Sequence, residues 1–181
     1  AAVVRSVVPL DGHPVTVELG SGTGMLARCL HDVLGPATLL DSSPAMVEVA
    51  SKALVAEGLG DWSAAVADLS EGIPGGPYEL ALAQMFLHHV DDVPALLRAL
   101  RRAMTPGGVV VIADLDHDAA KRYHATAVDF HGHHGFCRGE LRGWLEKAGY
   151  RDICFHDAGV VGKEVDGERQ DFPMFLAVAK A

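Results

Sequence analysis

The stretch from Val15 to Gly24 constrains the fold of this chain more than any other part of the sequence. It begins with the apolar run VTVEL, which predicts a β-strand, and continues into GSGTG, with glycines at positions 20, 22 and 24. Glycine allows a tight turn and lets a ligand approach main-chain N–H groups that a Cβ atom would hold away. In open α/β sheets, such strand-to-helix turns lie at the carboxyl ends of the strands, where ligands bind. The stretch therefore predicts an α/β protein with a ligand site at residues 20–24.

Strands and helices alternate along the rest of the chain. Apolar residues at helical spacing follow the glycines up to Leu34, and Gly35-Pro36 predicts the end of this first helix. Ser43 is the predicted N-cap of the next helix, with Pro44 in its first turn. We expect that helix to turn five apolar side chains inward, namely Met46, Val47, Ala50, Leu54 and Val55. Further strands are predicted at residues 37–41, 63–67, 79–85, 109–113, 151–156 and 172–179, and further helices at 93–104 and 138–148.

This alternation predicts a Rossmann-like, doubly wound, mainly parallel sheet in a three-layer α/β fold, because parallel neighbours need right-handed helical crossovers. The polar residues 162–171 interrupt the alternation, since they have no helical pattern. A hairpin-type connection there makes the last strand antiparallel to its neighbours. With 181 residues, of which 49% are hydrophobic, the chain is expected to form a single domain over residues 1–181.

The composition excludes several classes of partner. The formal net charge of -9 argues against a general binder of nucleic-acid phosphates. No apolar run approaches the ~18 residues that cross a bilayer, so no membrane partner is expected. Cys29, Cys137 and Cys154 are too scattered for a disulfide framework, and we expect each to be a small core residue of a cytoplasmic protein. The chain starts without Met, and we expect that its N-terminus has been trimmed.

The chain resembles the class I S-adenosylmethionine-dependent methyltransferases, of the small single-domain bacterial type, over nearly its whole length. The residues that carry the resemblance are ELGSGTG at 18–24, Asp41, Asp68-Leu69, QMFLHHV at 84–90 and TPGG at 105–108. The resemblance implies a seven-stranded sheet with a reversed seventh strand. It also implies methyl transfer from S-adenosyl-L-methionine to a small-molecule acceptor by direct SN2 displacement.

The resemblance further implies which residues bind the methyl donor. Asp41 lies 21 residues after Gly20, close to the ~20-residue offset at which an acid after the second strand reaches ribose hydroxyls. Asp68 is placed to accept from the adenine amino group, and Met46 to pack on the adenine face. The expected cofactor-binding residues are Glu18, Leu19, Gly20, Ser21, Gly22, Asp41, Ser42, Met46, Asp68, Leu69, Gln84 and Met85.

Two alternatives to this function stay open. Gly22-x-Gly24-x-x-Ala27 also fits the dinucleotide fingerprint, so the first alternative is a nicotinamide-dependent reductase. A chain of 181 residues leaves no room for the separate substrate domain of such a reductase. The second alternative is a non-catalytic module that binds S-adenosylmethionine or a partner protein.

Seven of the ten histidines fall between His88 and His134. Most of these lie in residues 114–137, which we interpret as a flap over the site because long polar loops are usually functional. An acceptor that carries a proton needs a base, and histidine suits that role at neutral pH. The candidates are His88, His124, His131 and His134, and the motifs do not assign the base among them.

The same region raises the possibility of a metal. The run HGHH at 131–134 and the acids that follow the fifth strand, Asp114, Asp116 and Asp118, contain metal-ligand side chains. Adjacent histidines are poorly spaced for one tetrahedral site, however, and the sequence has no closed Cys/His set. We therefore expect no bound metal.

Overall fold

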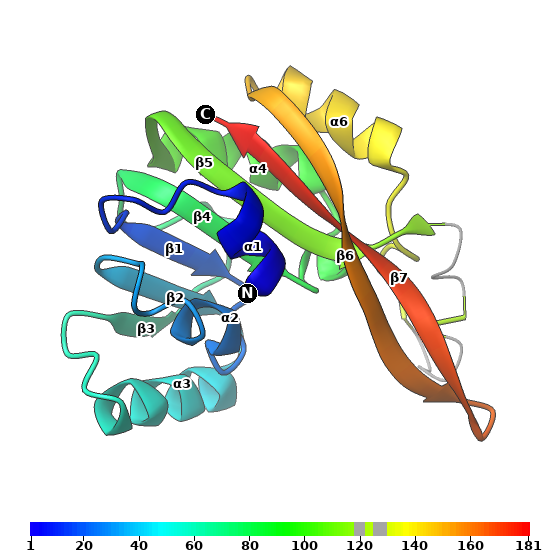
Figure 1. Ribbon diagram of the computed structural model, residues 1–181, viewed down its shortest axis with the longest axis horizontal. Helices are drawn as coiled ribbons and strands as arrows, with labels where there is room; N and C mark the ends of the chain where they lie inside the picture. The colour runs from blue at the N-terminus through cyan, green and yellow to red at the C-terminus, as the bar shows by residue number, and fades with distance from the viewer. Residues whose placement is uncertain (118–121, 125–129) are drawn as a thin grey trace.

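A seven-stranded sheet runs through the computed structural model, which describes residues 1–117, 122–124 and 130–181 (Figure 1). The strands lie in the order β3-β2-β1-β4-β5-β7-β6. β7 is antiparallel to both β5 and β6, and the other neighbouring pairs are parallel, which confirms the predicted reversed last strand. The strands are β1 (Thr16–Leu19), β2 (Ala37–Asp41), β3 (Ser63–Val66), β4 (Tyr78–Gln84), β5 (Met104–Leu115), β6 (Arg151–Val165) and β7 (Glu168–Lys180).

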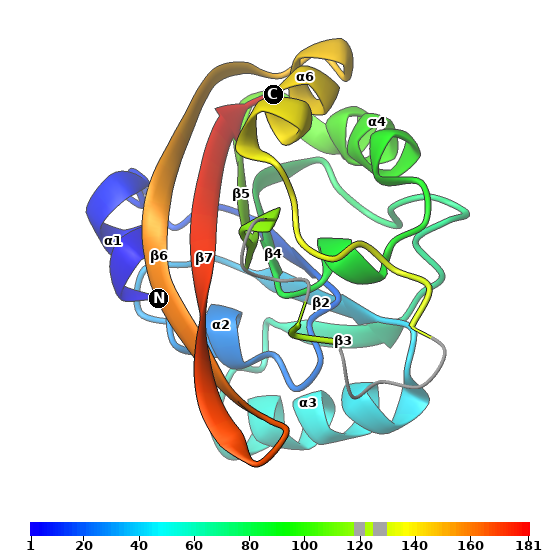
Figure 2. The same ribbon diagram turned by 90° about the vertical axis from the view of Figure 1, so that its right-hand side faces the viewer.

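Helices cover both faces of the sheet and complete the predicted three layers (Figure 2). Buried residues of α4 and α6 belong to one hydrophobic core, and buried residues of α1, α2 and α3 belong to a second core on the opposite face. The helices are α1 (Ala2–Val7), α2 (Met25–Arg28), α3 (Pro44–Ala56), α4 (Val93–Ala103) and α6 (Arg138–Lys147), with a 3₁₀ turn η1 (Leu87–His89) after β4.

β4 lies in the middle of the sheet and contacts both cores. Leu80 and Leu82 are buried in the core beneath α1, α2 and α3, whereas Ala81 and Ala83 are buried in the core beneath α4 and α6. Successive side chains of a strand point to opposite faces, so a strand that is covered on both sides needs a continuous apolar run. Residues 80–83 provide that run, as the sequence predicts.

The first predicted helix is shorter than its apolar pattern suggests. α2 ends at Arg28, and tighter turns follow, in which the Leu30 N–H donates to the Ala27 carbonyl at 2.8 Å. The prediction of a helix up to Leu34 is therefore wrong. Leu30 and Leu34 are nevertheless buried, because these turns bring both side chains onto the sheet. The pattern indicated the buried residues correctly but not the backbone.

α3 begins as predicted, because Ser43 Oγ accepts a hydrogen bond from the Met46 N–H at 3.4 Å. Ala50 and Leu54 are buried. Met46 and Val55 are 44% and 82% exposed, so the prediction that these two side chains point into the core is wrong. α3 packs mainly on β2 and β3, at the edge of the sheet, and a helix at an edge buries a narrower stripe.

β6 and β7 form a hairpin that extends well beyond the neighbouring strands (Figure 1). Its arms pair from Val160 with Pro173 to Val165 with Glu168. The turn between them is Asp166-Gly167, and both residues have positive φ, 54° and 80°, as a two-residue type I′ turn requires. Residues 162–171 are therefore mostly strand, which confirms the predicted hairpin-type connection but extends the strands beyond the predicted 151–156 and 172–179.

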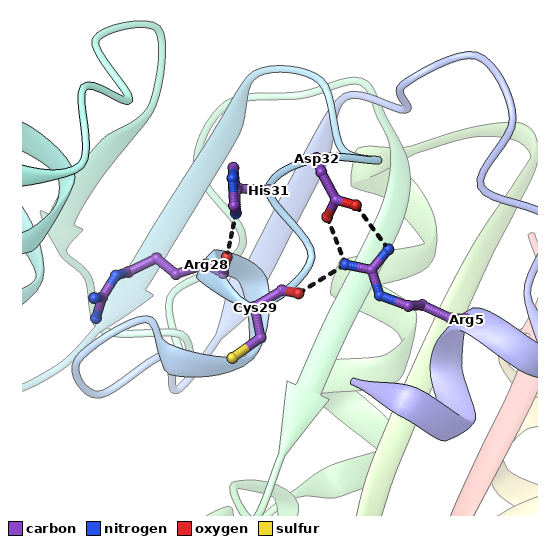
Figure 3. A network of polar contacts seen from close by, with 5 residues as sticks. All are labelled: Arg5, Arg28, Cys29, His31 and Asp32. Carbon is purple, nitrogen blue, oxygen red and sulfur yellow. Dashed lines mark hydrogen bonds and ion pairs between the residues drawn. The ribbon is translucent and has the colours of Figure 1, made fainter.

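α1 is attached to the turn after α2 by Arg5 (Figure 3). The Arg5 guanidinium donates to both carboxylate oxygens of Asp32 and to the Cys29 carbonyl, the last at 2.9 Å. On the same turn, His31 Nδ1 lies 2.9 Å from the Arg28 carbonyl. These contacts fix α1 over the core that Val4 and Val8 enter.

All three cysteines are free and exposed, so the expectation that they lie in the core is wrong. Cys29 leaves the core face because α2 ends one residue earlier. Cys137 precedes α6, and Cys154 lies on β6, which is an edge strand with one side unpaired. In the described part of the chain, no helix combines the length and the apolar character that a bilayer crossing requires.

Candidate functional site

A pocket of about 880 Å³ opens at the carboxyl ends of β1, β2, β3 and β4 and is closed on one side by α4. This is the edge at which open α/β sheets bind ligands. Its wall contains most of the residues that the sequence predicts to bind the cofactor, namely Gly20, Gly22, Asp41, Ser42, Met46, Asp68, Leu69 and Met85. The strand ends therefore bring together residues that are far apart in the sequence.

The three glycines of the turn after β1 are required for two different reasons. All have positive φ. A Cβ atom at Gly22 would have no atom within 4 Å, so this residue leaves open space at the pocket wall. A Cβ atom at Gly20 would come within 2.0 Å of the Phe86 ring, and one at Gly24 within 2.4 Å of Leu39. Only Gly22 matches the expectation of space for a ligand, whereas the other two allow close side-chain packing.

Asp41 connects the glycine turn to α3. Its Oδ2 accepts from the Gly22 N–H at 2.7 Å, and its Oδ1 accepts from the Ser43 N–H at 2.9 Å. Each carboxylate oxygen has two lone pairs, so both can still accept a hydroxyl of a ligand in the pocket. Asp41 thus fixes the shape of the pocket wall and presents two acceptors.

Asp68 also lines the pocket, after β3, next to Ala67, whose N–H donates to the Asp41 carbonyl at 3.0 Å. Its Oδ1 accepts from the Ser70 N–H at 2.9 Å and from the Ser70 hydroxyl at 2.6 Å. These hydrogen bonds hold the pKa of the Asp68 carboxyl below its usual range, so it is ionised at neutral pH. Asp68 and the adjacent Leu69 present a charged acceptor and a backbone edge to the pocket.

The other predicted cofactor-binding residues, Glu18, Leu19, Ser21 and Gln84, are not part of the pocket wall. Glu18 is buried beneath the turn, where its carboxylate accepts from the Ala27 N–H at 3.2 Å. Burial raises the pKa of Glu18 to about 7. Leu19 is a core residue, Ser21 is buried at the turn, and Gln84 is exposed at the end of β4.

The charge of the pocket separates the two kinds of ligand that a glycine turn can hold. Five carboxyl groups line the wall against a single guanidinium, that of Arg102; the acids are Asp41, Asp68, Glu71, Asp91 and Asp92. A dinucleotide carries a diphosphate, which these acids would repel. S-adenosylmethionine has a cationic sulfonium, an ammonium and no phosphate. The residues present therefore fit the methyl donor and not a nicotinamide dinucleotide.

Several wall residues were not predicted from the sequence, and they follow β4. Met85 has a positive φ of 51°, which is rare for a residue with a side chain. The chain then turns so that Phe86 packs on Gly20 and His89 joins the pocket wall. The motif QMFLHHV marks this region, but which of its side chains face the pocket depends on the turn.

His88 points away from the pocket and is 2% exposed. The ring Nδ1 of His88 lies 2.7 Å from Asp114 Oδ1, and the backbone N–H of His88 donates to Asp114 Oδ2 at 3.3 Å. Asp114 is completely buried and also accepts from the Leu115 N–H. A carboxylate can only accept, so His88 Nδ1 carries the hydrogen. The pair joins η1 to the end of β5.

His124 and His134 lie near His88, in a group of rings. His124 stacks on Phe130, with ring centroids 3.7 Å apart and planes within 3° of each other. The centroid of His124 is 5.1 Å from that of His88 and 5.9 Å from that of His134. Burial and the nearby His88 lower the pKa of His124 to about 4, and no described residue provides a hydrogen-bond partner for its Nδ1. His131 is exposed outside this group.

The ends of the predicted flap meet in a narrow neck. The Phe136 N–H donates to the Leu115 carbonyl at 2.9 Å, and Arg138 donates two hydrogen bonds to the Asp116 carboxylate at 3.0 and 2.7 Å. Residues 114 and 115 therefore belong to β5, and the segment that the neck encloses begins after Asp116 instead of at residue 114. Residues 118–121 and 125–129 of the predicted flap, with Asp118, lie outside the described residues.

Among the residues that are described, no three His, Cys, Asp or Glu side chains are grouped to hold a metal ion.

Comparison with known proteins agrees with the donor chemistry of the pocket. Residues 6–154 match the model of the family described as methyltransferase domain. A ubiquinone biosynthesis O-methyltransferase of Caulobacter vibrioides is 27% identical over 60% of this chain, and this chain spans 43% of that relative's length.

Solved structures share the fold over 99% of this chain. An S-adenosylmethionine-dependent methyltransferase from Mesorhizobium loti superposes with a TM-score of 0.75 at 20% identity, covering 96% of that chain. Phosphoethanolamine N-methyltransferase 2 from Haemonchus contortus, solved in complex with S-adenosyl-L-methionine, superposes with a TM-score of 0.79 at 18% identity, covering 51% of that chain. The family match, the strand order and the pocket chemistry agree, and the chain is a methyltransferase domain of the class I S-adenosylmethionine-dependent family.

Proposed function

We propose that this domain transfers a methyl group from S-adenosyl-L-methionine to a small-molecule acceptor at the pocket beside the glycine turn. The observation that carries the proposal is the acidic, phosphate-repelling wall around Gly22 and Asp41. Bound S-adenosyl-L-methionine supplies a methyl group that its sulfonium makes electrophilic. The chain's own task is to hold donor and acceptor in line and to exclude water.

The wall residues divide this binding task among them. The two free acceptor positions of Asp41 suit the ribose hydroxyls, and Asp68 suits the adenine amino group. Met46, which is half exposed at the start of α3, provides a flat apolar contact for the adenine. Gly22 lets the amino-acid end approach the turn. Glu18 supports the turn from below, through the Ala27 N–H.

A small-molecule acceptor is supported by the size of the pocket and by a relative. A volume of about 880 Å³ is within the usual range of small-molecule sites. The name of the Caulobacter relative places its methyl transfer in ubiquinone biosynthesis. Three exposed free thiols suit a reducing compartment, so we propose that the domain, residues 1–181, acts in the cytoplasm.

Calorimetric titration with S-adenosylhomocysteine tests the donor site. We expect micromolar binding by the unmodified protein and a loss of affinity of about tenfold or more in Asp41→Ala, because the variant loses two ribose acceptors and the contact to Gly22. Asp61→Ala, at an exposed acid outside the pocket wall, is the control and should bind normally. Equal affinity of Asp41→Ala and the unmodified protein would disprove the assigned role of Asp41. Tighter binding of NADH than of S-adenosylhomocysteine would favour the reductase instead.

A further inference from the structure

The geometry of the turn after β4 points to the acceptor and to its base. We propose that the acceptor carries an uncharged hydroxyl on an aromatic ring, that this hydroxyl lies beside His89, and that His89 takes its proton as the methyl group is transferred. This inference rests on the proposed function, because it assumes that the methyl donor occupies the same pocket. Neither the motifs nor the family match assigns a base or an acceptor to this chain.

The turn η1 separates two adjacent histidines into different roles. His88 points inward to Asp114 and is almost completely buried, whereas His89 is exposed and forms part of the pocket wall. A general base must come within hydrogen-bond distance of the proton that it removes. An acceptor in the pocket can approach His89, which lines the wall, but cannot reach the buried His88. The base is therefore assigned to a residue outside the four sequence candidates.

His88 and Asp114 act on His89 as positioning residues. The rings of His88 and His89 are in contact, with centroids 4.1 Å apart and planes inclined by 44°. Asp114 holds the backbone and the ring of His88 from β5, through two hydrogen bonds. Because η1 is only three residues long, fixing His88 also fixes the direction in which His89 projects.

Aromatic rings lie around His89. Phe130 lies 5.8 Å from His89 at an interplanar angle of 77°, and His124 lies 6.2 Å away at 75°. Edge-to-face arrangements at these distances are the ones that aromatic rings prefer. Phe86, which shares the pocket wall with His89, packs against Gly20. An acceptor with an aromatic ring can extend this packing, which favours a ring as the carrier of the hydroxyl.

The charges near His89 select among nucleophiles on such a ring. The acidic wall, including Asp91 and Asp92 close by in the sequence, disfavours a carboxylate or phosphate acceptor. Burial lowers the pKa of His89, and a positive charge on His88 lowers it further. A neutral amine attacks with its own lone pair, whereas a hydroxyl becomes a strong nucleophile only as it loses its proton, so an unprotonated histidine in the pocket favours a hydroxyl. A neutral hydroxyl is also compatible with the acidic wall.

Several other ionisable groups lie around His89. They are His88 on the same turn, Asp114 on β5, and His124 from residues 122–124, with His134 next to His124. Asp114 raises the pKa of His89, against the larger effects of burial and of His88. The net direction is downward, so His89 is neutral at pH 7 and able to accept a proton.

The proposed step balances without another reactant. The hydroxyl oxygen forms the new bond to the methyl carbon, and the carbon–sulfur bond breaks with its electron pair moving to sulfur. The hydroxyl proton moves to the unprotonated ring nitrogen of His89 and later to water. The products are a methyl ether and a neutral thioether.

Methylation of three probes that share one ring tests this proposal. Phenol, aniline and benzoate are each incubated with S-adenosyl-L-methionine, and S-adenosylhomocysteine production is measured. We expect phenol to be methylated in preference to the other two. Preferred methylation of aniline or benzoate, or methylation of none of the three by protein that binds S-adenosylhomocysteine, would overturn the proposed acceptor class. Failure to bind S-adenosylhomocysteine would instead refute the proposed function itself.

Variants of three histidines then test the base. For His89→Gln we expect the rate with phenol at pH 7 to fall by about a hundredfold or more, with affinity for S-adenosylhomocysteine unchanged. The rate of this variant should rise with pH as phenolate forms, whereas that of the unmodified protein should level off near neutrality. His31→Gln, at an exposed residue outside the pocket (Figure 3), is the matched control. His88→Asn retains a donor for Asp114 but loses the ring that packs on His89, so its rate should fall less than that of His89→Gln, and its rate should still level off near neutrality. If His89→Gln has the same rate and pH profile as the unmodified protein, His89 is excluded as the base.

Discussion

A carboxyl group lies beneath the glycine turn, and none of the residues that the structure describes gives it a charged partner. Glu18 is 3% exposed, and the Ala27 N–H is the hydrogen-bond donor that reaches it, at 3.2 Å. Burial penalises the ionised form and raises its pKa to about 7, from an ordinary value of 4.5. Between these two values the folded protein holds a proton that the unfolded chain has released. Ionisation of Glu18 therefore lowers the free energy of unfolding as the pH rises from about 4.5 to 7.

Glu18→Gln tests this linkage because glutamine has the same shape and stays neutral. The variant should gain stability relative to the unmodified protein as the pH rises through this window. The raised pKa of Glu18 corresponds to a gain in the free energy of unfolding of at most roughly 3 kcal/mol for Glu18→Gln at pH 8. Urea unfolding of both proteins at several pH values measures the difference. A difference that does not change with pH would show that Glu18 has an ordinary pKa.

Single residues of the site differ in how far the sequence can predict them. Asp41 and Asp68 could be predicted to share one site because both follow parallel strands, and the carboxyl ends of such strands meet at one edge. Phe86 and His89 could not. Their directions depend on the positive φ of Met85 and on the contact of η1 with Asp114, which comes from a distant strand. Local patterns contain no signal for such non-local contacts.

Side chains of the β6–β7 hairpin contact residues 122–124. Lys163 Nζ donates to the Tyr123 carbonyl at 2.6 Å and lies 4.5 Å from the centre of the Tyr123 ring. Phe172 contacts the same ring edge to face, with centroids 5.1 Å apart, and Arg122 forms an ion pair with Asp166 at the hairpin turn. The hairpin thus supports the segment that carries His124.

Lys163→Met removes the charged donor and keeps the length of the side chain. A hydrogen bond to a charged group and a cation–π contact together stabilise by more than 1 kcal/mol, so we expect hydrogen exchange at residues 122–124 to accelerate by about tenfold or more. Exchange in β1 and β4 should not change. Lys180→Met removes an exposed ion pair with Asp152 elsewhere on the hairpin and serves as the control. Equal hydrogen exchange at residues 122–124 in the two variants would show that Lys163 does not stabilise this segment.

The spacing of apolar residues predicted helices and strands well where these elements are half buried or fully buried, and poorly where they are exposed. β4 is apolar throughout because two layers cover it. The outer arms of β6 and β7 are polar because much of their surface faces solvent, so their composition is that of a loop. The dipeptide Asp166-Gly167 was the available signal, since Asp-Gly is typical of a two-residue hairpin turn.

At the level of the whole molecule, a ligand in the pocket contacts segments from four strand ends and α4. Free S-adenosylhomocysteine at a hundred times its Kd should stabilise the folded state by about 2.7 kcal/mol. For a chain of this size, this corresponds to a rise in Tm of about 5–10 °C. Thermal unfolding measures it, with NADH at equal concentration as the control that the acidic wall should exclude. A larger rise with NADH would contradict the charge argument for the methyl donor.

The neck formed by Leu115, Asp116, Phe136 and Arg138 has a consequence for how such a domain diversifies. The neck holds the two ends of the enclosed segment by contacts of its own, so the sheet does not depend on the length of that segment. The entropy of closing a loop changes slowly, by about 0.6 kcal/mol for each doubling of length. Evolution, or a protein engineer, can therefore exchange residues 117–135 for segments of other lengths and sequences. New acceptors can be recruited in this way while the machinery for the methyl donor is inherited intact.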